Sequence, residues 1–118
     1  MKKNNCILGQ EAENIAYNYL QDMGYTMLER NFRCKLGEID IIALNDGYIV
    51  FIEVKYRHNS KSGYRREAVN YYKQRNITKV ATYYLVKKGA YNKSCRFDVV
   101  EITGDNIELI KNAFDAVY

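Results

Sequence analysis

Residues 36–57 of this chain read LGEIDIIALNDGYIVFIEVKYR, and the two apolar runs in this segment decide the fold. Gly37 to Leu44 and Tyr48 to Arg57 are rich in isoleucine and valine, which is typical of β-strands. Asn45-Asp46-Gly47 lies between the runs, and an Asp-Gly step favours a tight hairpin turn. The segment therefore predicts a hairpin in the middle of a hydrophobic sheet.

Helical patterns precede and follow this hairpin. Apolar residues recur at helical spacing from Gly9 to Met23 and from Arg66 to Lys88, and a glycine follows each stretch. Further strands are expected at residues 25–32, 96–102 and 106–110, and a polar loop at 58–63. The order α-β-β-β-α-β predicts one α/β domain, residues 1–118, with a central mixed sheet flanked by helices.

The composition excludes several classes of protein. With 47% hydrophobic and 27% charged residues, the chain is an ordinary globular one, and it has no apolar run of about 18 residues that could cross a membrane. Its start does not read as a secretory signal. The three cysteines lack a CxxC pair, and their spacing with His58 matches no zinc template. We expect small buried thiols and a cytoplasmic location.

The positive charge is concentrated in the middle of the chain. The whole sequence has a net charge of +4, but residues 30–96 contain 15 basic and five acidic residues, a net charge of +10. Lysine and arginine displace the counterions condensed on nucleic-acid phosphates, so this segment suggests a polyanion as partner. A solvated basic surface without a partner is the alternative.

Acidic residues interrupt the hairpin strands. Alternation places Glu38, Asp40 and Ile42 on one face of the first strand, opposite Ile39, Ile41 and Ala43. On the second strand, Glu53 and Lys55 interrupt an apolar face, and Asp40 can lie near Glu53 if the register allows. Two carboxylates repel each other by roughly 4 kcal/mol at about 4 Å, and a divalent cation removes that penalty. Lys55 could then activate a water molecule. A structural Glu–Lys pair on a half-exposed strand is the alternative.

The two strands, LGEIDIIA and VFIEVKYR, resemble the YraN-like family of small bacterial proteins. That family is similar to archaeal Holliday junction resolvases and belongs to the PD-(D/E)xK, or restriction-endonuclease-like, group. The similarity also includes Gly9, Glu13, Arg30-Asn31, Lys73-Gln74-Arg75 and residues 96–100. It implies a restriction-endonuclease-like three-layer fold and a DNA endonuclease that depends on Mg²⁺ or Mn²⁺. Ile39 stands where the wider group has proline, and Ala12 where the family commonly has glycine.

The resemblance assigns roles to four residues. Asp40 matches the metal-binding aspartate, Glu53 the second acidic ligand and Lys55 the motif lysine. Glu13 matches a first-helix glutamate that approaches the metal site in related resolvases, and Glu11 is its rival if the helix is rotated. Because those resolvases act as dimers on two-fold junctions, the resemblance also implies a homodimer.

Basic and aromatic residues near the hairpin are expected to contact nucleic acid. The predicted set is Arg57, Lys61, Tyr64, Arg65, Arg66, Lys73 and Arg75, with Tyr56 beside it. Glu38 and Asp98 are expected at the rim of the site or in contact with its ligands. A nucleic-acid-binding module without catalysis is the second hypothesis, and a protein-interaction scaffold on the same fold is the third.

Overall fold

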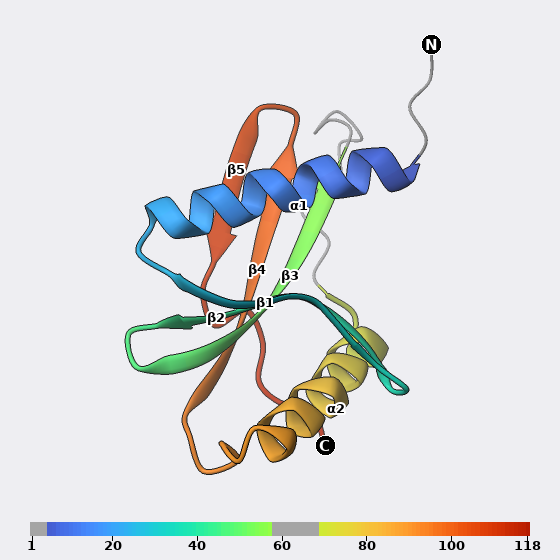
Figure 1. Ribbon diagram of the computed structural model, residues 1–118. Coiled ribbons are helices and arrows are strands. Elements are labelled where there is room, and N and C mark those ends of the chain that lie inside the picture. The colour runs from blue at the N-terminus through green and yellow to red at the C-terminus, as the bar shows by residue number, and fades with distance from the viewer. Residues whose placement is uncertain (1–4, 58–68) are drawn as a thin grey trace.

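The computed structural model describes residues 5–57 and 69–118 of the chain. Its elements are α1 (Asn5–Asp22), β1 (Thr26–Cys34), β2 (Gly37–Asn45), β3 (Tyr48–Arg57), α2 (Tyr71–Lys87), β4 (Cys95–Thr103) and β5 (Asn106–Ile110) (Figure 1). This order confirms the predicted α-β-β-β-α-β arrangement and the additional strand at 106–110.

The five strands form one mixed sheet in the order β1-β2-β3-β4-β5. Strands β3 and β4 are parallel, and every other neighbouring pair is antiparallel. The parallel pair requires a crossover connection, and α2 lies in that connection. The predicted mixed sheet is therefore confirmed.

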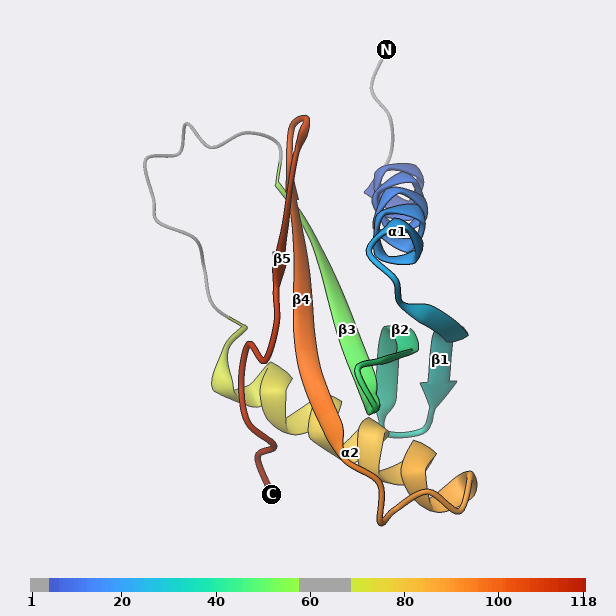
Figure 2. The same cartoon turned by 90° about the vertical axis from the view of Figure 1, so that its left-hand side faces the viewer.

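The two helices bury different faces of the sheet. Ala12, Ala16 and Leu20 of α1 belong to a core cluster with Val50 and Ile52. The buried face of α2 belongs to a second cluster, in which Ile77, Val80, Ala81, Tyr84 and Leu85 pack with Ile42, Phe51, Phe97 and Val99. Figure 2 shows α1 and α2 towards opposite ends of the long strands β3 and β4. The result is a three-layer α/β/α domain, and neither helix described is long and apolar enough to cross a membrane.

The hairpin between β2 and β3 forms as expected. Asn45 pairs with Tyr48, which leaves Asp46 and Gly47 as the two turn residues. Both have positive φ angles, 53° and 82°, as a type I′ turn requires. The right-handed twist that this turn imposes matches that of the flanking strands, so the Asp-Gly step fixes the register of the pair.

Both predicted helix starts were wrong. Helix α1 begins at Asn5 rather than Gly9, and α2 begins at Tyr71 rather than Arg66. Asn70 is the N-cap of α2, where its side chain accepts a hydrogen bond of 2.9 Å from the backbone amide of Lys73. The apolar periodicity indicated that these segments are helical, but capping chemistry sets the boundary of α2.

Some apolar residues of the two predicted helical patterns are exposed. Ile15 and Met23 at α1, and Tyr72 of α2, lie outside the core clusters because only a narrow stripe of each helix touches the sheet. Cys34 and Cys95 are free thiols that are partly buried and pack against the edge of a core cluster, so they are less buried than expected. The prediction for Cys6 lies outside the described side chains.

Asp98 is part of a buried network rather than of the rim where it was expected. Its side chain has 0% exposure and accepts two hydrogen bonds of 2.8 Å from Arg96. Tyr25 donates to it at 2.7 Å, and the backbone amide of Asn112 at 2.9 Å. Burial, reinforced by the Asp98 carboxylate, raises the pKa of the Tyr25 phenol far above its ordinary value. These bonds connect β4 to the start of β1 and to the segment after β5. Loss of either Arg96 or Asp98 would leave the other charge buried without its partner, which is strongly destabilising.

Candidate functional site

Strand β2 is irregular at Asp40. The pairing of β2 with β3 runs from Asn45–Tyr48 to Ile41–Ile52, and one further step would place Asp40 opposite Glu53. There the Asp40 carboxylate, instead of a backbone carbonyl, accepts a hydrogen bond of 2.8 Å from the amide of Val54. The register thus brings the two acidic residues near each other, the arrangement that the hairpin left open.

This irregularity overturns one expectation about the strand. Ile39 was expected on the same face as Ile41 and Ala43, but it packs with Ile42 in the core cluster that contains the buried face of α2. Ile41 and Ala43 pack in the other core cluster, with Ala12, Ala16 and Leu20 of α1. Strict alternation would put Ile39 and Ile42 on opposite faces, so the strand turns between Ile39 and Ile41. The turn falls at Asp40.

A small polar cavity lies beside the two acids. Its volume is about 160 Å³, and its polar lining consists of Asp40, Glu53, Glu38, Lys73 and Asn76. Leu36, Gly37 and Ile77 complete the lining. The cavity therefore lies between the start of β2, the middle of β3 and the first turns of α2.

Gly37 lets α2 approach this part of β2. Its φ angle of 146° lies in a region that favours glycine. A Cβ atom at this position would be only 3.3 Å from Cγ2 of Val80. A side chain here would press against α2, so the glycine of the GEID segment helps to shape the cavity.

Like charges and burial act together on Asp40. Burial is the largest cause that raises the pKa of this carboxyl group, and the charge of Glu53 raises it further, to about 7. The hydrogen bond from Val54 partly opposes this rise, whereas the charges of Glu13 and Glu38 add to it. A divalent cation would remove both the repulsion and part of the desolvation penalty.

Lys73 supplies the positive charge at the site. Its Nζ lies 3.1 Å from Oε2 of Glu53, whose side chain is only 13% exposed. Burial opposes the charged form of Lys73, but the charge and hydrogen bond of Glu53 leave its pKa above the ordinary value. Since the lysine side chain is 49% exposed, it can move out to solvent and leave Glu53 available to another cation.

The donor set fits a hard divalent cation. Among the residues that the structure describes, no group of three His, Cys, Asp or Glu side chains is placed to hold a metal ion. Asp40 and Glu53 provide neighbouring carboxylate groups in one cavity, whose third carboxylate, that of Glu38, pairs with Arg33. Mg²⁺ commonly binds through one or two carboxylates and keeps several of its water molecules. Two carboxylate ligands are therefore enough to bind it.

The other residues predicted to be catalytic lie near this cavity without lining it. Glu13, on α1, is close enough for its charge to raise the pKa of Asp40. Glu11, its rival, is exposed. Lys55 lies two residues beyond Glu53 on β3 and is partly buried. Asp40, Glu53 and Lys73 therefore line one cavity, whereas Glu13 and Lys55 do not line it.

The predicted nucleic-acid contacts divide into two groups. Arg57 donates a hydrogen bond of 3.1 Å to Glu101, which holds its guanidinium at the sheet. Arg75 is exposed on α2, one helical position from Asn76 of the cavity. The remaining predictions, Lys61, Tyr64, Arg65 and Arg66, lie outside the described residues, as does His58. All of them remain predictions.

One lining residue of the cavity was not predicted from the sequence, and another agrees with its predicted place. Asn76 lines the cavity, and its spacing of three residues from Lys73 on one helix was a usable signal. Glu38 lines the cavity and also pairs with the exposed Arg33 at 3.2 Å. This is consistent with its expected place at the rim.

Comparison with known proteins gives a family but no activity. A model described as "Uncharacterised protein family UPF0102" matches residues 12–102. A UPF0102 protein of Lachnoclostridium phytofermentans is 52% identical over 114 residues, covering 96% of this chain and 97% of the relative. One from Persephonella marina is 46% identical over 112 residues (95% and 97%), and one from Clostridium botulinum 50% over 114 residues (91% and 93%). These matches confirm the resemblance to YraN-like proteins at the level of the family.

Proposed function

We propose that this chain, which belongs to the uncharacterised protein family UPF0102, hydrolyses phosphodiester bonds in DNA with the help of Mg²⁺ or Mn²⁺. The observation that carries the proposal is the burial of Asp40 beside Glu53 in one polar cavity. Burying two carboxylates together is unfavourable unless a cation joins them. The family resemblance, with its nuclease group, points to the same two residues.

The roles of the residues follow from their positions. Asp40 and Glu53 would hold the cation, and the charge of Glu13 would tune their affinity. When bound, the cation supplies an acidified water molecule and neutralises charge that develops on the phosphate. Lys73 holds the phosphate from the open side of the cavity, where its ammonium group is half exposed. Lys55 assists the attacking water from β3.

The charge of the chain favours nucleic acid as substrate. Residues 30–96 have a net charge of +10, and the cavity opens among them. A polyanion gains affinity from such a surface by counterion release. We place the activity in the cytoplasm and on branched or damaged DNA, with a homodimer as the form that acts on two-fold junctions.

A nucleic-acid-binding module without catalysis is the second candidate. One observation favours it: Lys73 already compensates the charge of Glu53 at 3.1 Å, so the site has a cation of its own. In that case DNA binding would be sensitive to salt and unaffected by chelators. The dependence on a divalent metal separates the two candidates.

The direct test is hydrolysis of junction, flap and duplex DNA in Mg²⁺ or Mn²⁺, with an EDTA control and a matched RNA set. The proposal predicts cleavage that requires the metal. Cleavage that continues in EDTA, or no cleavage of any substrate by a preparation that binds the metal, would contradict it.

A divalent cation should stabilise the wild-type protein at about pH 8. Ligand at about 100 times its dissociation constant adds about 2.7 kcal/mol to the free energy of unfolding. For a domain of this size that corresponds to a rise in Tm of roughly 10 °C. Differential scanning fluorimetry with MgCl₂ or MnCl₂ measures the shift. The Tm of the Glu53→Gln variant should not rise when the metal is added. An equal rise in Tm for wild type and variant would exclude a metal site at Glu53.

Lys73→Met should slow cleavage by roughly 10²–10³-fold, the range for loss of one transition-state contact. It should not weaken metal binding, because it removes a charge that competes for Glu53. Cleavage rates measured against Mn²⁺ concentration separate these two effects. Lys111→Met is the matched control, since Lys111 is 48% exposed and lies 4.0 Å from the turn residue Asp46. If the Lys73 variant instead needs more Mn²⁺ and keeps its maximal rate, Lys73 acts on the metal and not on the phosphate.

A further inference from the structure

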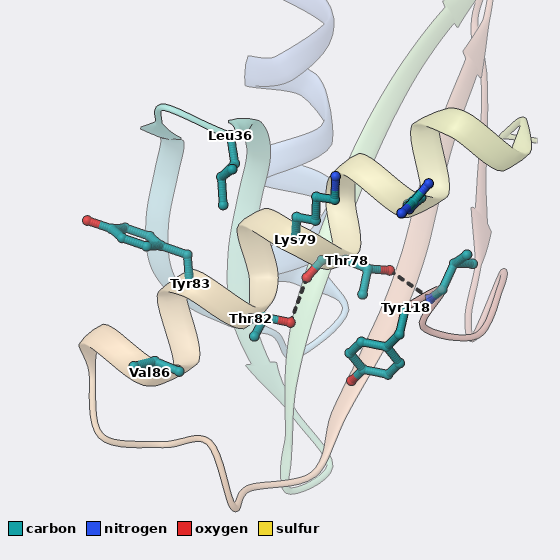
Figure 3. A pocket seen from close by; sticks show the side chains of 9 residues that line it. Leu36, Thr78, Lys79, Thr82, Tyr83, Val86 and Tyr118 are labelled. Carbon is teal, nitrogen blue, oxygen red and sulfur yellow. Dashed lines mark hydrogen bonds between the residues drawn. The ribbon is translucent and has the colours of Figure 1, made fainter.

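A long apolar groove follows the outer side of α2. Its volume is about 500 Å³, and its lining atoms are almost all apolar. Leu36, from the turn between β1 and β2, and Tyr118 lie on opposite sides of α2, with Thr78 and Thr82 between them (Figure 3). From Arg75 to Val86 the groove extends about 16 Å along the helix axis. Its size falls within the range of small-ligand sites.

The groove floor is apolar because its hydroxyl groups are already engaged. Thr82 donates to the carbonyl of Thr78 at 2.8 Å, and Thr78 donates to the carbonyl of Gln74 at 2.8 Å. Thr78 Oγ1 also accepts a hydrogen bond of 3.0 Å from the amide of Val117 (Figure 3). That bond fixes the C-terminal segment against α2 as one wall of the groove.

All charged side chains of α2, the helix that forms the groove, are positive. Tyr71–Lys87 contains four basic residues and no acidic one. Two of the four, Arg75 and Lys79, line the groove. An apolar floor with a cationic rim matches a ligand that has flat apolar rings joined by anionic groups.

The groove adjoins the polar cavity, with which it shares one lining residue. Leu36 lines both of them, and Arg75 of the groove is the neighbour of Asn76 of the cavity. A chain-like ligand that leaves the cavity therefore meets the groove next.

From these observations we propose that the groove binds an unpaired stretch of the nucleic-acid strand next to the cleaved phosphate. Its bases pack on Tyr83, Val86 and Leu36, and its phosphates lie at Arg75 and Lys79. Bases in a continuous duplex are stacked and cannot enter such a groove. The substrate is then DNA with unpaired nucleotides beside the cleavage point. This inference rests on the proposed function, since it takes the cavity to hold the cleaved phosphate.

A second copy of the chain is the rival occupant. A symmetric dimer through this face would bring Arg75 and Lys79 of one α2 towards the same two residues of the other. Like charges at that interface would repel each other, whereas a nucleic-acid strand neutralises them. The charge pattern therefore favours the strand.

The test measures binding without catalysis. Fluorescence anisotropy in EDTA, at about 0.1 M salt, compares an oligothymidylate of about 12 nucleotides with a duplex of the same length. Val86→Asp and Tyr83→Ala should weaken binding of the single strand by roughly ten-fold or more and change duplex binding far less. Val86 is 61% exposed, so the aspartate should not disturb folding.

Two exposed residues outside the groove serve as controls. Ile15→Asp introduces the same charge on α1, and Tyr91→Ala removes an exposed ring; both should bind like wild type. If wild type cleaves or binds DNA but neither groove variant changes single-strand binding, the groove inference is wrong and the nuclease proposal stands. If wild type neither binds nor cleaves nucleic acid, both fail. If Val86→Asp instead dissolves a dimer in sedimentation and leaves DNA binding intact, the groove is an interface between copies.

Discussion

Glu53→Gln should abolish metal-dependent cleavage of DNA, with a loss of roughly 10³-fold or more in rate. The substitution keeps the size of the side chain and removes its charge. Among the described residues, Glu53 lines the cavity together with Asp40, and its side chain is only 13% exposed. Without it Asp40 would be the one proposed ligand left for the cation, and Lys73 would lose its partner at 3.1 Å.

Glu38→Gln is the matched control for this experiment. Glu38 lines the same cavity, but its side chain is 37% exposed and pairs with Arg33. Its substitution should reduce the rate by less than about ten-fold, the effect of a rim charge. Both variants are measured for cleavage and for the cation-induced change in Tm. Equal, small losses in the two variants would show that the cavity carboxylates do not hold a catalytic metal.

The hairpin could be predicted from the sequence because its determinants are local. An Asp-Gly turn and alternating apolar residues fix the register of β2 and β3, and the register brings Asp40 to Glu53. The place of Ile39 could not be predicted in this way. It depends on the bond between Asp40 and Val54, which joins residues of different strands and interrupts the alternation.

The partners of Lys73 and Asp98 depend on contacts between segments that are distant in the chain. Lys73 lies in the first turn of α2, which Asn70 caps, and from there it reaches Glu53 of β3. Asp98 was expected near the site, yet it is buried with Arg96 and Tyr25. A carboxylate on a strand has the same appearance in the sequence whether it binds a cation or a buried arginine. Only the packing separates the two roles.

The groove on α2 could not be inferred from the sequence for a related reason. Its lining comes from the turn before β2, the outer side of α2 and the C-terminal segment. No stretch of the sequence contains an apolar pattern for it, because Thr78 and Thr82 become apolar floor residues only after their hydroxyl groups bond within the fold.

In the absence of metal, Asp40→Asn should stabilise the protein at about pH 8 by roughly 2–4 kcal/mol. The folded pKa of Asp40 is raised to about 7, whereas the unfolded chain has the ordinary value near 4. Between these pH values the folded protein binds more protons than the unfolded one. The free energy of unfolding of the wild type therefore falls as the pH rises through this window, and this contribution is constant above it. Asparagine cannot ionise, and it can still accept the hydrogen bond from Val54.

Urea unfolding in EDTA at several pH values between about 4 and 8.5 measures the difference between wild type and Asp40→Asn. The difference should be near zero at the acid end and reach its full size above the folded pKa of Asp40. Asp46→Asn is the control, since Asp46 is an exposed turn residue, and it should follow the wild type throughout. Parallel curves for wild type and Asp40→Asn would mean that Asp40 carries no desolvated charge. A stabilising effect at high pH would instead identify the energy that a cation can recover, because the same repulsion from Glu53 that destabilises the empty site favours Mg²⁺ or Mn²⁺ binding there.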